Sequence, residues 1–342
     1  MITKRLTEGI QSLSPAYFSL PMATGIIAIA SFTIGYSTIG SILLWVNNIV
    51  ILSLVLLLLI RVIFFFPLFL SDLDSQNKGS EFLSIVAALS LCGSANLLIA
   101  HRHALADFCL ISAIFLWTVF SYGFLFKMVR RNRKHSLYQG IDGAWLLLVV
   151  SLEGLSILSN LLAEIHPPIH ELLFLIALGF HLLGMWFYLT IIMLLFYRLL
   201  FLPWRDLDFN ASYWITMGAA SIITLAGSMF IQSLPQSNLL DSIIPSIKVA
   251  TIFFWVVACW WIPLLVYLEI EKLHHTSFRY HAGSWSFVFP LGVFTMCTWH
   301  LAQVMQIPYL KLIPEKTIFL AWIAWIVVFI AMCQKWITAK KN

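Results

Sequence analysis

The sequence predicts an all-α membrane protein, and three observations lead to this prediction. Hydrophobic residues make up 61% of the 342 residues and charged residues only 10%, whereas a soluble domain carries about 25% charged residues. Ten apolar runs follow one another, each about 20 residues long, which is the length of a helix that spans a bilayer. The connections between the runs are short, so we expect one integral membrane domain over residues 1–342.

The ten runs are taken in chain order as ten transmembrane helices. The first follows two basic residues, but it is too long for a signal-peptide core and leads into more membrane segments, so it counts as a span. The second, sixth and eighth are expected to extend beyond their windows. The windows lie near residues 15–34, 41–60, 82–101, 105–124, 143–162, 173–192, 211–230, 247–266, 284–303 and 317–336.

The odd-numbered spans are rich in small residues and the even-numbered spans in bulky ones. Gly, Ala, Ser and Thr fill 40 of 100 positions in the odd windows, as in "MATGIIAIAS" (22–31), and 19 of 100 in the even windows, as in "VILSLVLLLLI" (50–60). Small residues let helices approach closely, whereas bulky apolar residues suit lipid. We therefore expect five helical hairpins with the odd helices inside. Composition alone leaves a central pore and a solid bundle equally open.

The basic residues predict how the chain sits in the membrane. With ten spans, the two termini share one side. The other side holds only Arg102, Lys248, Lys311 and Lys316. We therefore expect both termini in the cytoplasm, and we interpret the basic run 130–134 as an anchor at the inner leaflet rather than a nucleic-acid site. The side with the termini holds sixteen basic residues: Lys4, Arg5, Arg61, Lys78, Lys127, Arg130, Arg131, Arg133, Lys134, Arg198, Arg205, Lys272, Arg279, Lys335, Lys340 and Lys341.

The sequence lacks the motifs of enzymes and of metal sites. It has no phosphate-binding loop, no G-x-G-x-x-G after a strand and no G-x-S-x-G elbow. In His166-Pro-Pro-Ile-His170, the prolines interrupt the helix that would bring both imidazoles to one zinc ion. We expect no enzyme, no cofactor, no metal and no nucleic-acid partner. The cysteines all lie in predicted spans and are expected to be apolar core residues: Cys92, Cys109, Cys259, Cys297 and Cys333.

Ionisable residues at membrane depth are functional candidates. Glu153 lies near the middle of the fifth span, and two interpretations stay open: a protonated or ion-paired structural carboxyl, and a proton-coupling or gating group. His181, in an even span, is expected to be a hydrogen-bonded packing residue. Lys248 begins the eighth span at the outer face, either as an anchor or as a group that attracts anions to a pore mouth.

The ninth span opens with the stretch "WSFVFPLG" (285–292). Pro290 removes a helix hydrogen bond and is expected to kink the helix, with Phe289 just before it and Gly292 just after it. His300 follows Phe289 by 11 residues, about three helical turns, and so shares its face; it is a candidate pore-mouth group. Further candidate kink or pore-lining positions in the odd spans are Pro21, Gly25, Gly93 and Gly218.

Five segments in register with the spans resemble one family. They are "SPAYFSLPMATGIIAIA" (14–30), "GAWLLLVVSLEGLSIL" (143–158), "NASYWITMGAASIITLAGS" (210–228), "FFWVVACWWIPLL" (253–265) and "SWSFVFPLGVFTMCT" (284–298). The sequence is similar to the tellurite-resistance/dicarboxylate transporter family, which includes TehA-type bacterial channels, yeast malate permeases and sulfite exporters, and the slow anion channels of plant guard cells. The resemblance covers nearly the whole chain.

The resemblance implies an anion channel or carrier in the cell (inner) membrane. Relatives have five helical hairpins in a quasi-fivefold arrangement around a central pore and assemble as homotrimers with one pore per subunit. In relatives, a phenylalanine beside the kink of the ninth helix plugs the pore. The matching residue here is Phe289, with Phe287 as the second candidate and Gly292 expected to leave room beside the ring. The alternative that both rings only pack between helices stays open.

One residue departs from the family pattern. Close bacterial relatives have a neutral polar residue where this chain has Glu153, and a carboxylate repels anions unless it is protonated or paired. Two transport functions therefore stay open: a channel for small inorganic and organic anions, and a proton-coupled carrier of C4-dicarboxylates such as malate, of tellurite or of sulfite. A third class, a structural or sensory membrane protein, would transport nothing.

Overall fold

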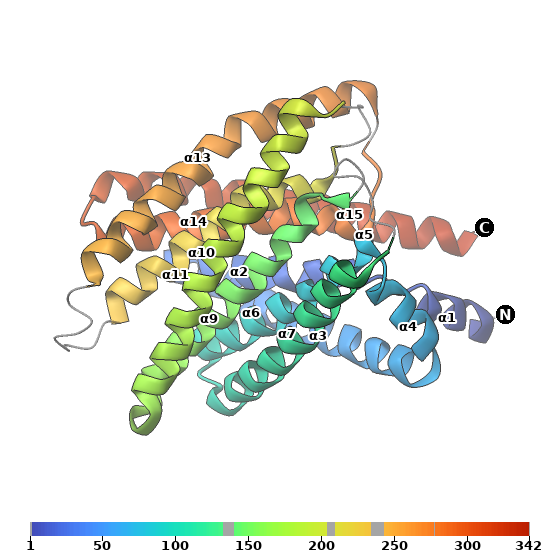
Figure 1. Ribbon diagram of the computed structural model, residues 1–342, viewed down its shortest axis with the longest axis horizontal. Coiled ribbons are helices and arrows are strands. Elements are labelled where there is room, and N and C mark those ends of the chain that lie inside the picture. Colours follow the sequence, from blue (N-terminus) through green and yellow to red (C-terminus); the bar gives the residue numbers. More distant parts are fainter. Residues whose placement is uncertain (1, 133–139, 204–208, 234–242, 277, 342) are drawn as a thin grey trace.

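The computed structural model describes residues 2–132, 140–203, 209–233, 243–276 and 278–341 (Figure 1). All regular structure in these residues is helical. Arg133, Lys134 and Arg205, which contribute to the predicted orientation, lie outside the described residues. The longer helices are α1 (Ile2–Gln11), α2 (Ser19–Ile34), α3 (Ser37–Phe64), α4 (Phe66–Leu73), α6 (Leu83–Ala100), α7 (His103–Arg130), α9 (Leu147–Ala163), α10 (His170–Phe201), α11 (Ile215–Ser233), α13 (Ile244–His275), α14 (Trp285–Val304) and α15 (Leu312–Lys341).

Ten helical segments in the described residues are long and apolar enough to cross a membrane, and they match the ten predicted runs in order. The second, sixth and eighth extend as expected, to Ser37–Phe64, Pro167–Phe201 and Ile244–His275. The fourth and tenth also extend beyond their windows. A helix longer than the hydrocarbon core fits by tilting or by placing its ends among the headgroups. The short helices α1, α4 and α5 (Gln76–Gly79) were not predicted, because they are too short to give an apolar run.

The spans divide into two classes by burial. In the odd-numbered spans, between 67% and 94% of the most apolar window is buried; in the even-numbered spans, the share is between 22% and 39%. The even spans expose many large apolar side chains, such as Trp45, Phe115 and Trp186. Small residues therefore coincide with burial and bulky residues with exposure, because small side chains permit the close helix contacts that shield a backbone on all sides.

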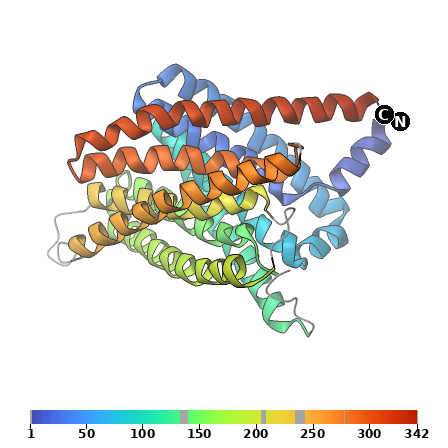
Figure 2. The ribbon, with the colours of Figure 1, turned by 90° about the horizontal axis from the view of Figure 1, so that it is seen from above.

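The five buried helices contact one another in a closed sequence. α2 packs on α6, α6 on α9, α9 on α11, α11 on α14, and α14 packs back on α2. Each buried helix also packs on the exposed helix that follows it, giving the hairpins α2–α3, α6–α7, α9–α10, α11–α13 and α14–α15. In two perpendicular views, α1 and the last turns of α15 lie at the same end of the molecule (Figures 1 and 2).

Each buried helix begins with a short 3-10 turn. Three of these turns start with a side-chain cap, in which Ser14, Asp142 and Asn210 accept a hydrogen bond from the backbone N–H two residues further on. Such caps satisfy N–H groups that have no partner inside the helix. The turns are η1 (Pro15–Phe18), η2 (Ser80–Phe82), η3 (Gly143–Leu146), η5 (Ala211–Trp214) and η6 (Ala282–Ser284).

These five turns also contact one another in a closed sequence, which we call the collar. η1 contacts η2, η2 contacts η3, η3 contacts η5, η5 contacts η6, and η6 contacts η1. The contact is close between η3 and η5, where a Cβ at Gly143 would overlap the backbone of Ser212. The amino-terminal ends of all five buried helices therefore meet at one end of the molecule.

A basic residue near the end of the exposed helix binds the chain just before the collar in four hairpins. Arg61 donates to the carbonyl of Leu13 at 2.6 Å, and Arg198 donates to the carbonyl of Ile141. Each of these carbonyls belongs to the residue before a capping residue. The other two contacts also involve the residue before the N-cap of a collar turn: Lys335 donates to the carbonyl of Tyr280 at 3.3 Å, whereas Lys272 lies over the ring of Phe209, 5.7 Å from the ring centre. We call Arg61, Arg198, Lys272 and Lys335 the basic latches.

Candidate functional site

Phe289 and Pro290 lie inside α14 and face α11. The helix continues on both sides of Pro290, which has no N–H to complete its turn. Phe289 is fully buried, at 0% exposure. A Cβ at Gly218 of α11 would lie 2.9 Å from Cγ of Pro290 and 3.3 Å from Cε1 of Phe289. The glycine that gives room to this ring and its proline is therefore Gly218.

Phe287 has a different environment. Its ring packs edge-on against Trp214 of the collar, with ring centres 4.6 Å apart and planes at 85°. Trp214 is itself fixed by a hydrogen bond of 3.0 Å from its indole N–H to Oε2 of Glu269. Phe287 thus lies nearer the collar and is partly buried, whereas Phe289 lies one step deeper between α14 and α11.

Gly292 lies against α2. A Cβ at Gly292 would lie 2.9 Å from side-chain atoms of both Ile26 and Ile27. The absence of a side chain at this position therefore allows α14 to approach α2. From sequence alone, a glycine that lets two helices pack closely cannot be distinguished from one that leaves room beside the Phe289 ring, because both roles require only a small residue at this position.

The remaining predicted kink and close-packing positions lie at helix contacts. A Cβ at Gly25 would lie 3.3 Å from Nδ2 of Asn47, and a Cβ at Gly93 would lie 2.8 Å from Cδ2 of Leu158. Both glycines thus bring neighbouring helices together. Pro21 lies in the first turn of α2, directly after η1, where a proline disturbs no hydrogen bond of the helix interior.

Glu153 of α9 is directed at α10. Its Oε2 lies 2.8 Å from Nδ1 of His181, and the exposures of the two side chains are 0% and 2%. Its Oε1 has no hydrogen-bond partner. A Cβ at Gly184 would overlap that oxygen, so the carboxylate fills the space that the glycine leaves on α10. Glu153 is thus hydrogen-bonded to His181, an arrangement that fits both interpretations left open from sequence.

The two predicted mouth groups lie near the carboxyl end of α14 and the start of α13. His300 is partly buried, and its Nδ1 lies 3.0 Å from Oε1 of Gln232 at the end of α11. The amide of Gln232 in turn lies 3.3 Å from Oε1 of Gln303, so the three side chains form one polar group. Lys248 is exposed on the second turn of α13.

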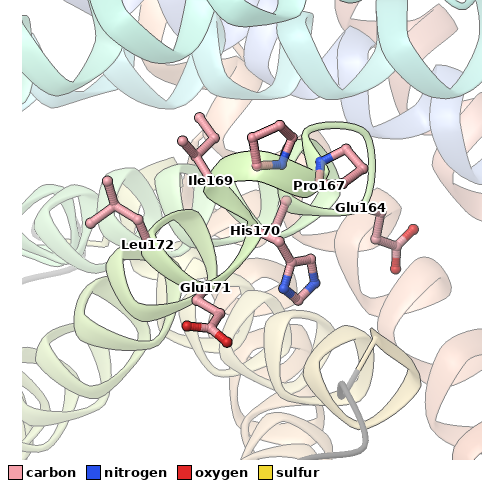
Figure 3. Close-up of a pocket in the computed structure, with 8 residues that line it drawn as sticks. Glu164, Pro167, Ile169, His170, Glu171 and Leu172 are labelled. Atoms are coloured by element: carbon pink, nitrogen blue, oxygen red, sulfur yellow. The ribbon is translucent and has the colours of Figure 1, made fainter.

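A pocket of about 780 Å³ lies at the connection between α9 and α10 (Figure 3). The carboxylates of Glu164 and Glu171 and the imidazole of His170 lie on the same side of this turn. His166 pairs with Asp107 of α7 at 2.9 Å, and the ring of His170 stacks on Phe174. The two histidines of the His166-Pro-Pro-Ile-His170 stretch thus have separate partners. No group of three or more potential metal ligands occurs among the described residues.

Two groups of residues at the collar were not singled out from sequence. Asp142 caps η3, and burial raises its pKa, although the Ala144 N–H, the Asn210 amide and Arg198 favour its ionised form. Arg61 is buried and pairs with Asp72 at 2.6 Å, while Lys78 approaches the same carboxylate from solvent at 2.9 Å. A signal for the latches is present in the sequence, since Arg61, Arg198 and Lys272 follow the end of an even-numbered run and Lys335 stands one residue before the end of the tenth.

Comparison with known proteins gives a family match over most of the chain. The model of the family described as "Voltage-dependent anion channel" (SLAC1) matches residues 12–333. An uncharacterized membrane protein of Mycobacterium tuberculosis, found in two strains, is 32% identical over 152 residues, which cover 43% of this chain and 76% of that protein. An uncharacterized transporter of Methanocaldococcus jannaschii is 21% identical over 335 residues, which cover 95% of each chain.

Proposed function

This chain belongs to the voltage-dependent anion channel (SLAC1) family, and from that premise we propose that it is an anion channel with Phe289 as its gate. The family membership confirms the resemblance seen in the sequence. The observation that carries the proposal is the position of Phe289: a fully buried ring beside a proline, given room by Gly218 on the neighbouring buried helix. A buried aromatic ring closes a conduit by filling it and by keeping it dry.

The conduit we propose runs along the axis of the five buried helices, in a quasi-fivefold arrangement. Its support is the closed sequence of helix contacts and the matching closed collar. α2, α6, α11 and α14 contain no Asp, Glu, Lys or Arg. Anions would therefore be attracted by backbone dipoles, which are positive at the helix amino ends that meet in the collar. Such weak attraction favours passage of many small anions with poor discrimination.

We place the protein in the cell (inner) membrane with both termini in the cytoplasm. The excess of Lys and Arg on the terminal side and the common end occupied by α1 and α15 support this orientation. The exposed apolar faces of the even helices suit lipid and subunit contacts. By analogy with the family we propose a homotrimer in which each subunit has its own conduit.

A second candidate function is a proton-coupled carrier of C4-dicarboxylates such as malate, of tellurite or of sulfite. The observation that favours it is the buried pair of Glu153 and His181, because ionisable residues at membrane depth commonly belong to proton relays. A carrier would show saturable uptake and no unitary current. A channel would show unitary currents.

The test is a recording from purified protein in a planar bilayer. Wild type, Phe289→Ala and Phe287→Ala are compared at equal protein density, with chloride, nitrate and malate as the anions. We expect small unitary currents in wild type and a large gain in Phe289→Ala. Phe287→Ala is the matched control, since it removes a ring of the same size two residues away. A gain in Phe287→Ala alone would move the gate, and malate uptake without unitary currents would favour the carrier.

A further inference from the structure

Between the buried and exposed helix layers lies an ionisable pair that the conduit proposed above does not require. Glu153 on α9 and His181 on α10 are almost wholly buried and are 2.8 Å apart. The carboxylate turns towards α10, where Gly184 leaves the space for Oε1. That oxygen has no hydrogen-bond partner, so the carboxylate is only half satisfied. The pair is therefore a polar site built between the two helices of one hairpin.

No other charged group of the described residues lies beside the pair. α6 and α11, which pack on α9, contain no Asp, Glu, Lys, Arg or His. The ring of Phe230 on α11 covers His181, with ring centres 5.3 Å apart. Apart from His181, the acidic and basic side chains of α7, α10 and α13 lie towards the helix ends: His103, Asp107, Lys127, Arg130, His170, Glu171, Arg198, Lys248, Glu269, Glu271, Lys272, His274 and His275. Tyr188, about two turns from His181 on α10, donates its hydroxyl to the carbonyl of Thr216. Glu81 lies in η2 of the collar, which also contacts α9.

Such a pair has two states that differ by one proton. With an ionised carboxylate and a neutral imidazole that donates from Nδ1, the net charge is −1. One proton taken from water gives a carboxylic acid beside a neutral imidazole, or a carboxylate beside an imidazolium, and either form is neutral overall. A net charge without compensation is unfavourable in a dry interior. Proton uptake therefore removes the free-energy cost of the negative charge on the carboxylate, whose Oε1 has no hydrogen-bond partner.

We infer that Glu153 and His181 form a proton-binding site whose occupancy controls anion passage. This inference rests on the proposed function, because the controlled step is anion flow along the buried helices. The empty site places a negative charge on α9, one of those helices, and an uncompensated charge acts over a long range in a medium of low dielectric constant. Anion flux should therefore rise as the pH falls and the site fills.

The first experiment detects the proton without using transport. Infrared difference spectra of purified protein in lipid are recorded over a pH series, and the carbonyl band of a protonated carboxyl group is followed. We expect one component of this band that titrates in wild type, is missing in Glu153→Gln and remains in Glu315→Gln, the matched control on the exposed first turn of α15. His181→Gln keeps the carboxyl and should move the midpoint by about one pH unit or more, because it removes the paired group.

The second experiment measures anion flux into liposomes over the same pH series. Glu153→Gln imitates the filled site, so at neutral pH its flux should exceed that of wild type by about fivefold or more and should not vary with pH. A carbonyl band that titrates identically in wild type and Glu153→Gln, or a midpoint unchanged in His181→Gln, would overturn the site. Superimposable flux profiles of wild type and Glu153→Gln would overturn its control of anion passage. Normal infrared results with no flux in any variant would count against the channel and leave the proton site standing.

Discussion

At the scale of single residues, room for a ring beside a proline is provided by a glycine on another helix. Gly218 has the side chains of Pro290 and Phe289 within 3.3 Å of the place where a Cβ would stand. Protein interiors are packed so closely that one added methyl group displaces the neighbouring side chains. The position of the Phe289 ring therefore depends on α11 as much as on α14.

Gly218→Ala should disturb this contact. The added methyl group would push on a proline ring that cannot change its conformation freely, and overpacking of this kind costs about 1–3 kcal/mol. We expect a lower thermal unfolding temperature in detergent and, because Phe289 is displaced, a larger anion current. Gly179→Ala is the matched control, since nothing lies within 4 Å of its Cβ position on α10. Equal stability and equal currents in both variants would show that Pro290 and Phe289 accommodate a Cβ at position 218 with no effect on stability or on the gate.

Asp142 offers a second test at this scale. Burial raises its pKa, so the folded protein binds a proton here more tightly than the unfolded chain does. Stability from this group is therefore present below the ordinary aspartate pKa and is lost as the pH rises through the raised value. Asp142→Asn keeps the cap on Ala144 and has no charge to bury, so it should unfold at a higher temperature than wild type near neutral pH.

In acid below the ordinary aspartate value, the difference between Asp142→Asn and wild type should vanish. Asp142→Ala separates capping from charge, because it loses the cap at every pH, at a cost of about 1 kcal/mol. Thermal unfolding in detergent over a pH series measures all three proteins. A wild type that is more stable than Asp142→Asn at neutral pH would mean that the ionised carboxylate, with Arg198 nearby, favours the folded state.

At the scale of helices, the basic latches connect four of the exposed helices, α3, α10, α13 and α15, to the start of the buried helix in the same hairpin. Arg61 is buried and engages both the carbonyl of Leu13 and the carboxylate of Asp72. Without Arg61, the partly buried carboxylate of Asp72 would keep only the exposed Lys78 as a partner, and the carbonyl of Leu13 would lose the hydrogen bond from Arg61. Arg61 thus links the end of α3 to the chain just before η1.

Arg61→Ala and Lys78→Ala remove different partners of the same carboxylate. The buried pair should cost about 3–5 kcal/mol when broken from one side, whereas the exposed pair should cost about 0–1 kcal/mol. Thermal unfolding of the two variants in the same detergent gives the comparison directly. A loss in Lys78→Ala as large as that in Arg61→Ala would show that charge balance at Asp72, and not the latch, stabilises this end of the hairpin.

The sequence predicted the helices well and their contacts poorly. The order of the ten spans follows from apolar length, which one stretch of chain reveals by itself. The partner of Glu153 cannot be read from one stretch of chain, because His181 lies 28 residues away and contacts Glu153 only after α9 and α10 pack. The roles of Gly218 and Gly292 likewise depend on which helix each faces. Sequence shows that a residue is small and cannot show what occupies the space beside it.

At the scale of the whole molecule, the collar and the latches give the two ends of the protein different characters. The collar end brings together five helix amino termini, four basic latches, α1 and the last turns of α15. The opposite end carries the described connections of the hairpins, including the turn between α9 and α10 with its pocket. An anion that enters at the collar would meet the positive ends of the helix dipoles before it reached Phe289.

The side of the membrane on which the collar lies can be tested directly. The distribution of Lys and Arg predicts that the collar faces the cytoplasm. In a background with the five cysteines replaced, single cysteines are introduced as Glu8→Cys on α1, Thr338→Cys near the end of α15, and Tyr309→Cys at the opposite end, where Tyr309 is 83% exposed. A membrane-impermeant maleimide added to intact cells should label only Tyr309→Cys, and permeabilised cells should label all three. Labelling of Glu8→Cys and Thr338→Cys in intact cells would show the opposite orientation, in which anions meet the helix amino termini from outside the cell.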